Sequence, residues 1–148
     1  MEIDIVLTDA PAPGAREAIL NGLVRFNVER AGPHNWRPLA LLITDRSTGE
    51  TRGGLWGQTS WKWLFVELLF IPETHRGSGI GSSLMRQGEE EAIRRGCIGA
   101  WLDTYSFQAR GFYERLGYTL FGTIEDYPPG KDRFFLHKRL VPRAEYQS

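Results

Sequence analysis

The sequence predicts one mixed α/β domain, in which a central, mostly antiparallel sheet is flanked by helices. Its 148 residues are enough for one hydrophobic core and short for two. Three strand-like segments follow one another between residues 39 and 71, and a long helical pattern comes next. A doubly wound dinucleotide-binding fold would alternate strand and helix from the start, so this run of strands favours a mixed sheet.

Charge and cysteine content limit the expected partners. The 18 basic and 18 acidic side chains balance, so we expect neither a nucleic-acid nor a membrane partner. The single cysteine, Cys97, suits a reducing cytosol and is predicted to be a small buried hydrophobe. No leader pattern occurs, and no apolar run approaches the roughly 20 residues that span a bilayer, so a cytoplasmic protein is expected. The histidines show no metal-ligand spacing, so no metal is expected.

The N-terminal part is predicted to contain a strand and a helix. Apolar and polar residues alternate over residues 2–8, which predicts a half-buried strand. From Ala15, apolar residues recur at helical spacing until Gly32 and Pro33 end the helix.

Three consecutive strands are predicted next. Residues 39–44 form a short apolar strand, residues 45–50 have the composition of a hairpin turn, and residues 51–58 form the return strand. Glycines weaken a strand, so those within the return strand suggest a bulge or the close approach of another group. They are Gly53, Gly54 and Gly57.

Residues 61–71 give the strongest strand pattern, because residues 63–71 are apolar except for Glu67. Such a run predicts a central strand that is covered on both faces. A lone carboxylate in that setting costs on the order of several kcal/mol unless it is paired or functional. Glu67 is therefore a candidate either for a buried structural acid or for a catalytic group.

The second half is predicted to contain a helix over residues 79–95, a strand over 98–103, a helix over 107–116, and a hairpin formed by 118–125 and 133–140. Residues 141–148 are expected to be a polar tail of the single domain. The first of these helices has an apolar stripe and a polar face that is predicted to point outward. This face carries Arg86, Glu89, Glu90, Arg94 and Arg95.

A glycine-rich turn joins the central strand to the long helix. Its glycines allow unusual backbone dihedrals and leave room for an anion, and the helix start supplies N–H groups and a positive dipole end. The turn lacks the Gly-Lys-Ser/Thr ending of a Walker loop. It also lacks the third glycine of the dinucleotide fingerprint, where Ser82 stands. From the glycines alone, an anion site and an ordinary turn remain equally open.

Two motifs in this chain resemble the GNAT (Gcn5-related N-acetyltransferase) superfamily. Arg76, Gly79 and Gly81 match its acyl-coenzyme A pyrophosphate loop in register. The second motif lies in residues 106–118, where an alanine is followed by an aromatic-tyrosine pair and then by leucine, glycine and an aromatic residue. The order of predicted elements is also similar to the GNAT fold over nearly the whole chain. The resemblance implies acetyl-coenzyme A as co-substrate and an amine of a small molecule or peptide as acceptor.

The resemblance also implies site residues. Tyr113 is expected to be the general acid that protonates the departing thiolate, and a phenol pKa near 10 suits that task. Glu67 is expected to draw a proton from the acceptor ammonium, directly or through water. The expected coenzyme-binding residues are Leu69, Phe70, Ile71, Arg76, Gly77, Ser78, Gly79, Ile80, Gly81, Ser82, Ser106, Ala109 and Phe112. Ser106 stands where the family often has asparagine, which makes that contact a departure from the pattern.

The acceptor site is expected to be aromatic and acidic, since both suit a cationic amine. Its candidate residues are Trp56, Trp61, Trp63, Asp103, Tyr105 and Tyr127, with core or dimer surface as an equally open role for the tryptophans. The leading prediction is an N-acetyltransferase, with a homodimer as a family expectation. A non-catalytic acyl-coenzyme A sensor of the same fold is the alternative, and a nucleotide-binding oxidoreductase is a distant third.

Overall fold

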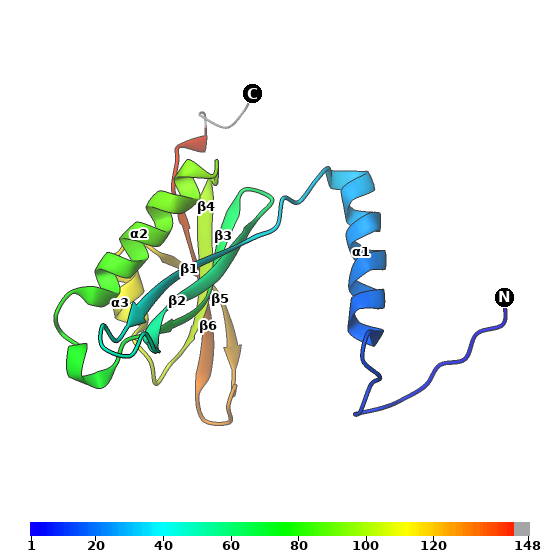
Figure 1. The fold of residues 1–148 in the computed structure, drawn as a ribbon, viewed down its shortest axis with the longest axis horizontal. Coiled ribbons are helices and arrows are strands. Elements are labelled where there is room, and N and C mark those ends of the chain that lie inside the picture. The colour runs from blue at the N-terminus through cyan, green and yellow to red at the C-terminus, as the bar shows by residue number, and fades with distance from the viewer. Residues whose placement is uncertain (144–148) are drawn as a thin grey trace. The chain divides into compact units, whose positions relative to one another are not determined.

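The computed structural model describes residues 1–143 (Figure 1). The chain forms two compact units, residues 1–34 and a second unit that begins at Asn35. The single-domain organisation therefore stays a prediction, and residues 144–148 of the predicted polar tail lie outside the described residues. Within the described range, no helix has the length and apolar character needed to cross a membrane.

The first unit contains the helix α1, Ala15–Ala31. Gly14 precedes it with a φ of 89°, and the Gly32 N–H donates to the Val28 carbonyl oxygen at 2.9 Å, so both ends fall where the sequence predicts them. The predicted strand over residues 2–8 was wrong, because the first unit contains no strand among its residues and hence no partner for this segment. Alternation alone makes no strand, since the backbone groups of a strand need a partner.

The second unit is built on a six-stranded mixed sheet, which confirms the predicted fold class. The strands follow the spatial order β1-β2-β3-β4-β6-β5, and every neighbouring pair is antiparallel except β3 and β4. Their bounds are β1 Arg37–Thr44, β2 Thr51–Ser60, β3 Trp63–Phe70, β4 Gly99–Tyr105, β5 Thr119–Glu125 and β6 Asp132–Arg139.

The glycines of β2 permit close contact with both neighbouring strands, as predicted. A Cβ atom at Gly54 would lie 2.2 Å from the Leu41 carbonyl oxygen, and one at Gly57 would lie 2.2 Å from that of Phe65. The register between β2 and β3 also shifts beside Gly57. Both features predicted from these glycines, a bulge and a close approach, are therefore present.

The helices α2, Ile80–Arg94, and α3, Arg110–Arg115, lie on the same side of the sheet (Figure 1). A short 3-10 turn, Glu73–His75, precedes α2. The helix α2 packs on β1 and β2, and a Cβ atom at its Gly88 would lie 3.3 Å from Leu55. Cys97 belongs to this core, as predicted, and burial raises the pKa of its thiol.

The central strand β3 is covered on one face only within the second unit. Leu64 and Val66, which face the core, are 0% and 3% exposed, whereas Leu68 and Phe70 are 60% and 55% exposed. Within the second unit, no helix covers the other face of the second half of this strand, so the prediction that both faces are covered stays a prediction. An apolar run indicates burial but does not say how many faces the helices of the unit cover.

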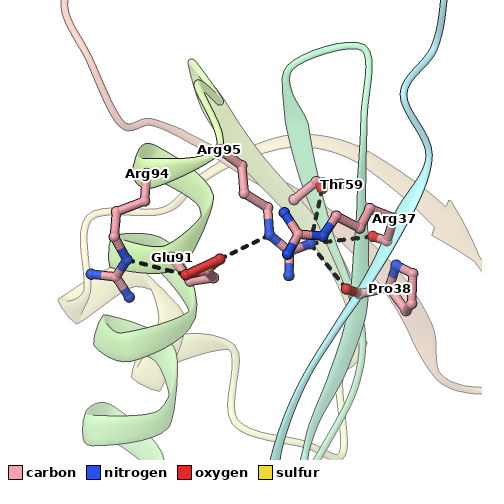
Figure 2. A network of polar contacts seen from close by, with 6 residues as sticks. All are labelled: Arg37, Pro38, Thr59, Glu91, Arg94 and Arg95. Atoms are coloured by element: carbon pink, nitrogen blue, oxygen red, sulfur yellow. Dashed lines mark hydrogen bonds and ion pairs between the residues drawn. The ribbon is translucent and has the colours of Figure 1, made fainter.

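The polar face predicted for α2 does not point outward throughout. Glu89 is buried, and the Arg95 side chain reaches from the C-terminal end of α2 to the sheet (Figure 2). Its Nη1 donates to the Pro38 carbonyl oxygen at 2.9 Å and to Thr59 Oγ1 at 3.2 Å, while its Nε pairs with Glu91 at 3.0 Å. These contacts attach the end of α2 to the edge of the sheet.

Candidate active site

The parallel strands β3 and β4 separate halfway along their length. Their shared register ends where Val66 lies opposite Leu102. Beyond this pair, β3 stays paired only with β2 and β4 only with β6. The facing edges of residues 67–70 and 103–105 therefore have no strand partner among residues 1–143. We call this opening the β3–β4 fork.

Glu67 is the first residue of β3 in the fork, and the structure corrects its predicted burial. Trp56 pairs with Leu68 and Gly57 pairs with Val66, so Glu67 is the extra residue of a β-bulge. Its side chain is exposed and has no ion-pair partner within the described part of the chain. Within the second unit, Glu67 is therefore not a buried structural acid. What remains is a carboxylate that solvent and a ligand can reach.

The glycine-rich turn leads from β3 into α2. Gly77 and Gly79 have φ values of 78° and 82°, which lie in the left-handed region that favours glycine. A Cβ atom at either position would meet no heavy atom within 4 Å, so the backbone of the turn is open to a ligand. Gly79 is also the N-cap of α2, whose first-turn N–H groups have no intrahelical acceptor. These features fit an anion cradle.

Arg76 connects this turn to the end of β3. Its Nε donates to the Ile71 carbonyl oxygen at 2.9 Å, and its guanidinium carbon lies 5.6 Å from the centre of the Phe70 ring. Because the hydrogen bond uses Nε, the two terminal nitrogens keep their N–H donors for an anion. The side chain is exposed beside the open glycines.

The two sequence motifs meet where α2 and α3 begin. A Cβ atom at Gly81 would lie 3.3 Å from the Phe112 ring and 3.8 Å from Ile71, so the turn, the end of β3 and α3 converge at this glycine. Ala109 is the N-cap of α3, directly before the aromatic pair. The structure thus brings together segments that are far apart in the sequence.

Tyr113 is half-buried in α3, and its ring makes edge contacts with Phe112 at 5.1 Å and Tyr118 at 6.2 Å between centroids. Burial, reinforced by the nearby Asp103 carboxylate, raises the pKa of Tyr113 to about 12. This pKa is higher than the ordinary tyrosine value assumed from the sequence. Tyr113 is protonated at neutral pH, as an ordinary tyrosine is, and is available as a proton donor.

Asp103, Tyr105 and Tyr127 come together at the fork end of β4, as an acceptor site would require. The Tyr105 ring stacks on Tyr127 at 5.9 Å and on Phe107 at 5.3 Å. Sequence reasoning missed Arg133, the cation that these groups surround. Arg133 donates from Nε to Asp103 Oδ1 at 2.9 Å, its Nη2 forms an ion pair with the same oxygen at 2.9 Å, and its guanidinium lies 5.0 Å from the Tyr127 ring.

The predicted tryptophans are not gathered at one place. Trp56 pairs with Leu68 and is 48% exposed, so it lies at the level of the fork. Trp61 lies in the turn between β2 and β3, and Trp63 begins β3, at the end opposite the fork. The Trp63 ring covers Gly99, where a Cβ atom would lie 2.4 Å away, which is a packing role.

Two polar residues organise the end of β4. The Ser106 N–H donates to the Asp132 carbonyl oxygen at 2.8 Å, and the Ser106 Oγ accepts the Asp132 N–H at 3.0 Å, which leaves its hydroxyl hydrogen for another partner. Gln108, which sequence reasoning missed, accepts from Thr104 Oγ1 at 3.0 Å and from the Tyr105 N–H at 2.8 Å. Within residues 1–143, no group of metal-ligating side chains is arranged to hold an ion.

Comparisons with known proteins agree with this geometry. Residues 19–118 match the Acetyltransferase (GNAT) family. The chain is 40% identical over 138 residues to an acetyltransferase of Agrobacterium fabrum, which covers 93% of this chain and 100% of that protein. It is 45% identical over 107 residues to the blasticidin-S acetyltransferase of Streptomyces morookaense, which covers 70% of this chain and 79% of that protein.

A solved structure has the same fold. The crystal structure of a protein from Agrobacterium tumefaciens described as an acetyltransferase superposes with a TM-score of 0.87 at 39% identity, covering 93% of this chain and 99% of that one. The family match spans both motifs of the candidate site. The chain therefore belongs to the GNAT acetyltransferase family.

Proposed function

We propose that this protein transfers the acetyl group of acetyl-coenzyme A to a primary amine of a small molecule or peptide, by direct attack within a ternary complex. The observation that carries the proposal is the β3–β4 fork, where the strands separate after Val66 and Leu102. The unpaired edge of β3 offers backbone groups to the amides of the pantetheine arm, much as a sheet edge accepts an added strand. Leu69, Phe70 and Ile71 supply this edge.

The pyrophosphate would bind at the turn before α2. Gly77, Ser78, Gly79 and the first residues of α2 offer backbone N–H groups, and Arg76 adds a charged donor. Since Gly81 contacts Phe112, a coenzyme anchored at this turn would extend along the fork toward α3. Ala109 and the free hydroxyl hydrogen of Ser106 would border its reactive end.

Glu67 and Tyr113 carry the proton transfers of this proposal. Glu67 removes a proton from the acceptor ammonium, directly or through water, because only the neutral amine has a lone pair for attack. The amine nitrogen then bonds to the thioester carbonyl carbon, the carbon–sulfur bond breaks, and the nitrogen gives up its second proton to solvent. Tyr113, which is protonated at neutral pH, gives its hydroxyl proton to the departing sulfur and regains a proton from solvent.

The acceptor is assigned to the fork end of β4, beside Asp103, Tyr105 and Tyr127. Arg133 already holds the Asp103 carboxylate, so the acceptor ammonium would meet Glu67 as the free carboxylate of the site. The relative that acts on blasticidin S supports a small-molecule acceptor. A cytoplasmic location and a homodimer belong to the same proposal.

The test is calorimetric titration of the protein with acetyl-coenzyme A, followed by a thiol-release assay over blasticidin S, aminoglycosides, polyamines and short peptides. We expect binding and thiol release with one class of amine. Binding without release from any acceptor would favour the non-catalytic sensor. Absence of binding would contradict the assignment of the turn before α2.

A further inference from the structure

A buried polar cluster lies behind Tyr113, and the proposed proton transfers do not use it. It consists of Glu89 in α2, Tyr118 after α3 and Lys138 in β6, and we call it the Tyr118 cluster. The Tyr118 hydroxyl donates to Glu89 Oε2 at 2.9 Å, and Lys138 Nζ donates to Glu89 Oε1 at 2.6 Å. Tyr118 is 3% exposed and Glu89 is 9% exposed. Buried polar groups are costly unless they are paired, and here each has its partner.

Tyr118 also contacts Tyr113 in two ways. The Tyr118 N–H donates to the Tyr113 carbonyl oxygen at 3.1 Å. The two rings pack edge to face, with 6.2 Å between centroids and 73° between planes. One residue therefore holds the main chain and the ring of Tyr113 while its hydroxyl is attached to α2.

The helix α3 needs such a support because it is short. It has six residues and no fully buried side chain, and a helix of this length is not stable alone. Gly117, which follows it, leaves space for Lys138, since a Cβ atom there would lie 3.4 Å from Lys138 Cε. Lys138 passes over this glycine to reach Glu89. The cluster thus joins α3, α2 and β6 at one point.

We propose that Tyr118 is a positioning residue that, through Glu89, fixes Tyr113 relative to the anion-binding start of α2. This inference rests on the proposed roles of Tyr113 and of that helix start. The thiol of the coenzyme lies at the far end of a long arm whose pyrophosphate is held at α2, so the proton donor must keep a constant place relative to that anchor. Tyr118 remains a donor at all working pH values, because burial and Glu89 raise its pKa.

The first test is a double-mutant cycle on turnover. Tyr118→Phe removes one hydroxyl and keeps the ring, and we expect kcat to fall about tenfold while the affinity for coenzyme A, measured by calorimetry, changes less than about twofold. Because Tyr118 acts through Tyr113, the same substitution in a Tyr113→Phe background should cause no further loss. An equal loss in both backgrounds, or none in either, would overturn the inference.

The second test needs no acceptor and keeps the inference separable from the proposed function. Amide hydrogen exchange of residues 110–118 is measured in the full chain with coenzyme A present. We expect faster exchange in Tyr118→Phe. Glu90→Gln is the control for Glu89→Gln, because it also replaces a glutamate of α2 by glutamine but on the exposed side of the helix, and its exchange rate should be unchanged. Glu89→Gln should resemble Tyr118→Phe. Unchanged exchange in both cluster variants would contradict the positioning role even in an active enzyme.

Discussion

Glu67 and Asp103 are the first residues of β3 and β4 beyond the last pair that joins these strands. The fork thus begins with a carboxylate on each side. Their surroundings differ, because Asp103 is held by Arg133 at 2.9 Å whereas Glu67 is an exposed bulge residue. The neutralised carboxylate suits a structural or orienting role and the free one suits proton transfer.

Replacement of Glu67 tests this division. In Glu67→Gln we expect turnover to fall on the order of 100-fold at low pH and less at high pH, where more of the acceptor amine is already neutral. Rates at saturating substrates across a pH series provide the measurement, with Glu90→Gln as a control for loss of one exposed carboxylate. A loss of the same factor at every pH would assign Glu67 a structural role instead.

The order of elements in the second unit and the two motifs could be predicted from the sequence, because they depend on local information. Turn residues, helical spacing and the glycines at 77 and 79 each predict the local backbone structure of the segment in which they occur. The bulge at Glu67 was indicated only indirectly, by the neighbouring Gly57 on β2. The sequence did not indicate that Glu67 is exposed, since an apolar run does not reveal where a strand loses its partner.

Long-range polar contacts were the main failure of the sequence-based predictions. Glu89 and Arg95 occupy positions on α2 that helical spacing assigned to the outer face. Glu89 binds Tyr118 and Lys138, and Arg95 binds the edge of β1. These partners are distant in sequence, so only the folded chain shows the contacts. Arg133 was missed for the same reason, because its partner Asp103 lies on another strand.

Arg76 should contribute to coenzyme binding through its charge. In Arg76→Gln we expect the affinity for coenzyme A to fall about tenfold or more, as for the loss of a charge-assisted hydrogen bond. Calorimetric titration gives the dissociation constant directly. Arg86→Gln is the matched control, because Arg86 is an exposed arginine of α2 outside the turn and its loss should leave the affinity nearly unchanged.

Gly57 should tolerate no side chain. An alanine Cβ would lie 2.2 Å from the Phe65 carbonyl oxygen, so β2 and β3 would have to separate beside the bulge. We expect Gly57→Ala to lower the free energy of unfolding by more than about 2 kcal/mol, whereas Gly111→Ala in α3 should be neutral or slightly stabilising. Urea unfolding of both variants decides this, and equal stabilities would contradict the close approach.

The raised pKa of Tyr113 makes stability depend on alkaline pH. Tyrosines of the unfolded chain ionise near pH 10, whereas burial and Asp103 raise the pKa of Tyr113 to about 12 in the folded protein. The folded state therefore retains a proton that the unfolded state has lost. The stabilisation is complete below about pH 10 and is lost as the pH rises toward 12, by at most about 1.4 kcal/mol per pH unit.

The comparison of wild type with Tyr113→Phe isolates this contribution, because the other titrating groups are common to both proteins. Urea unfolding at pH 8 and 9 gives a baseline difference in the free energy of unfolding. Between pH 10 and 11 the wild type should lose more stability than the variant, so this difference should shift in favour of the variant. A difference that stays constant to pH 11 would mean that the Tyr113 hydroxyl is as well solvated in the folded protein as in the unfolded chain.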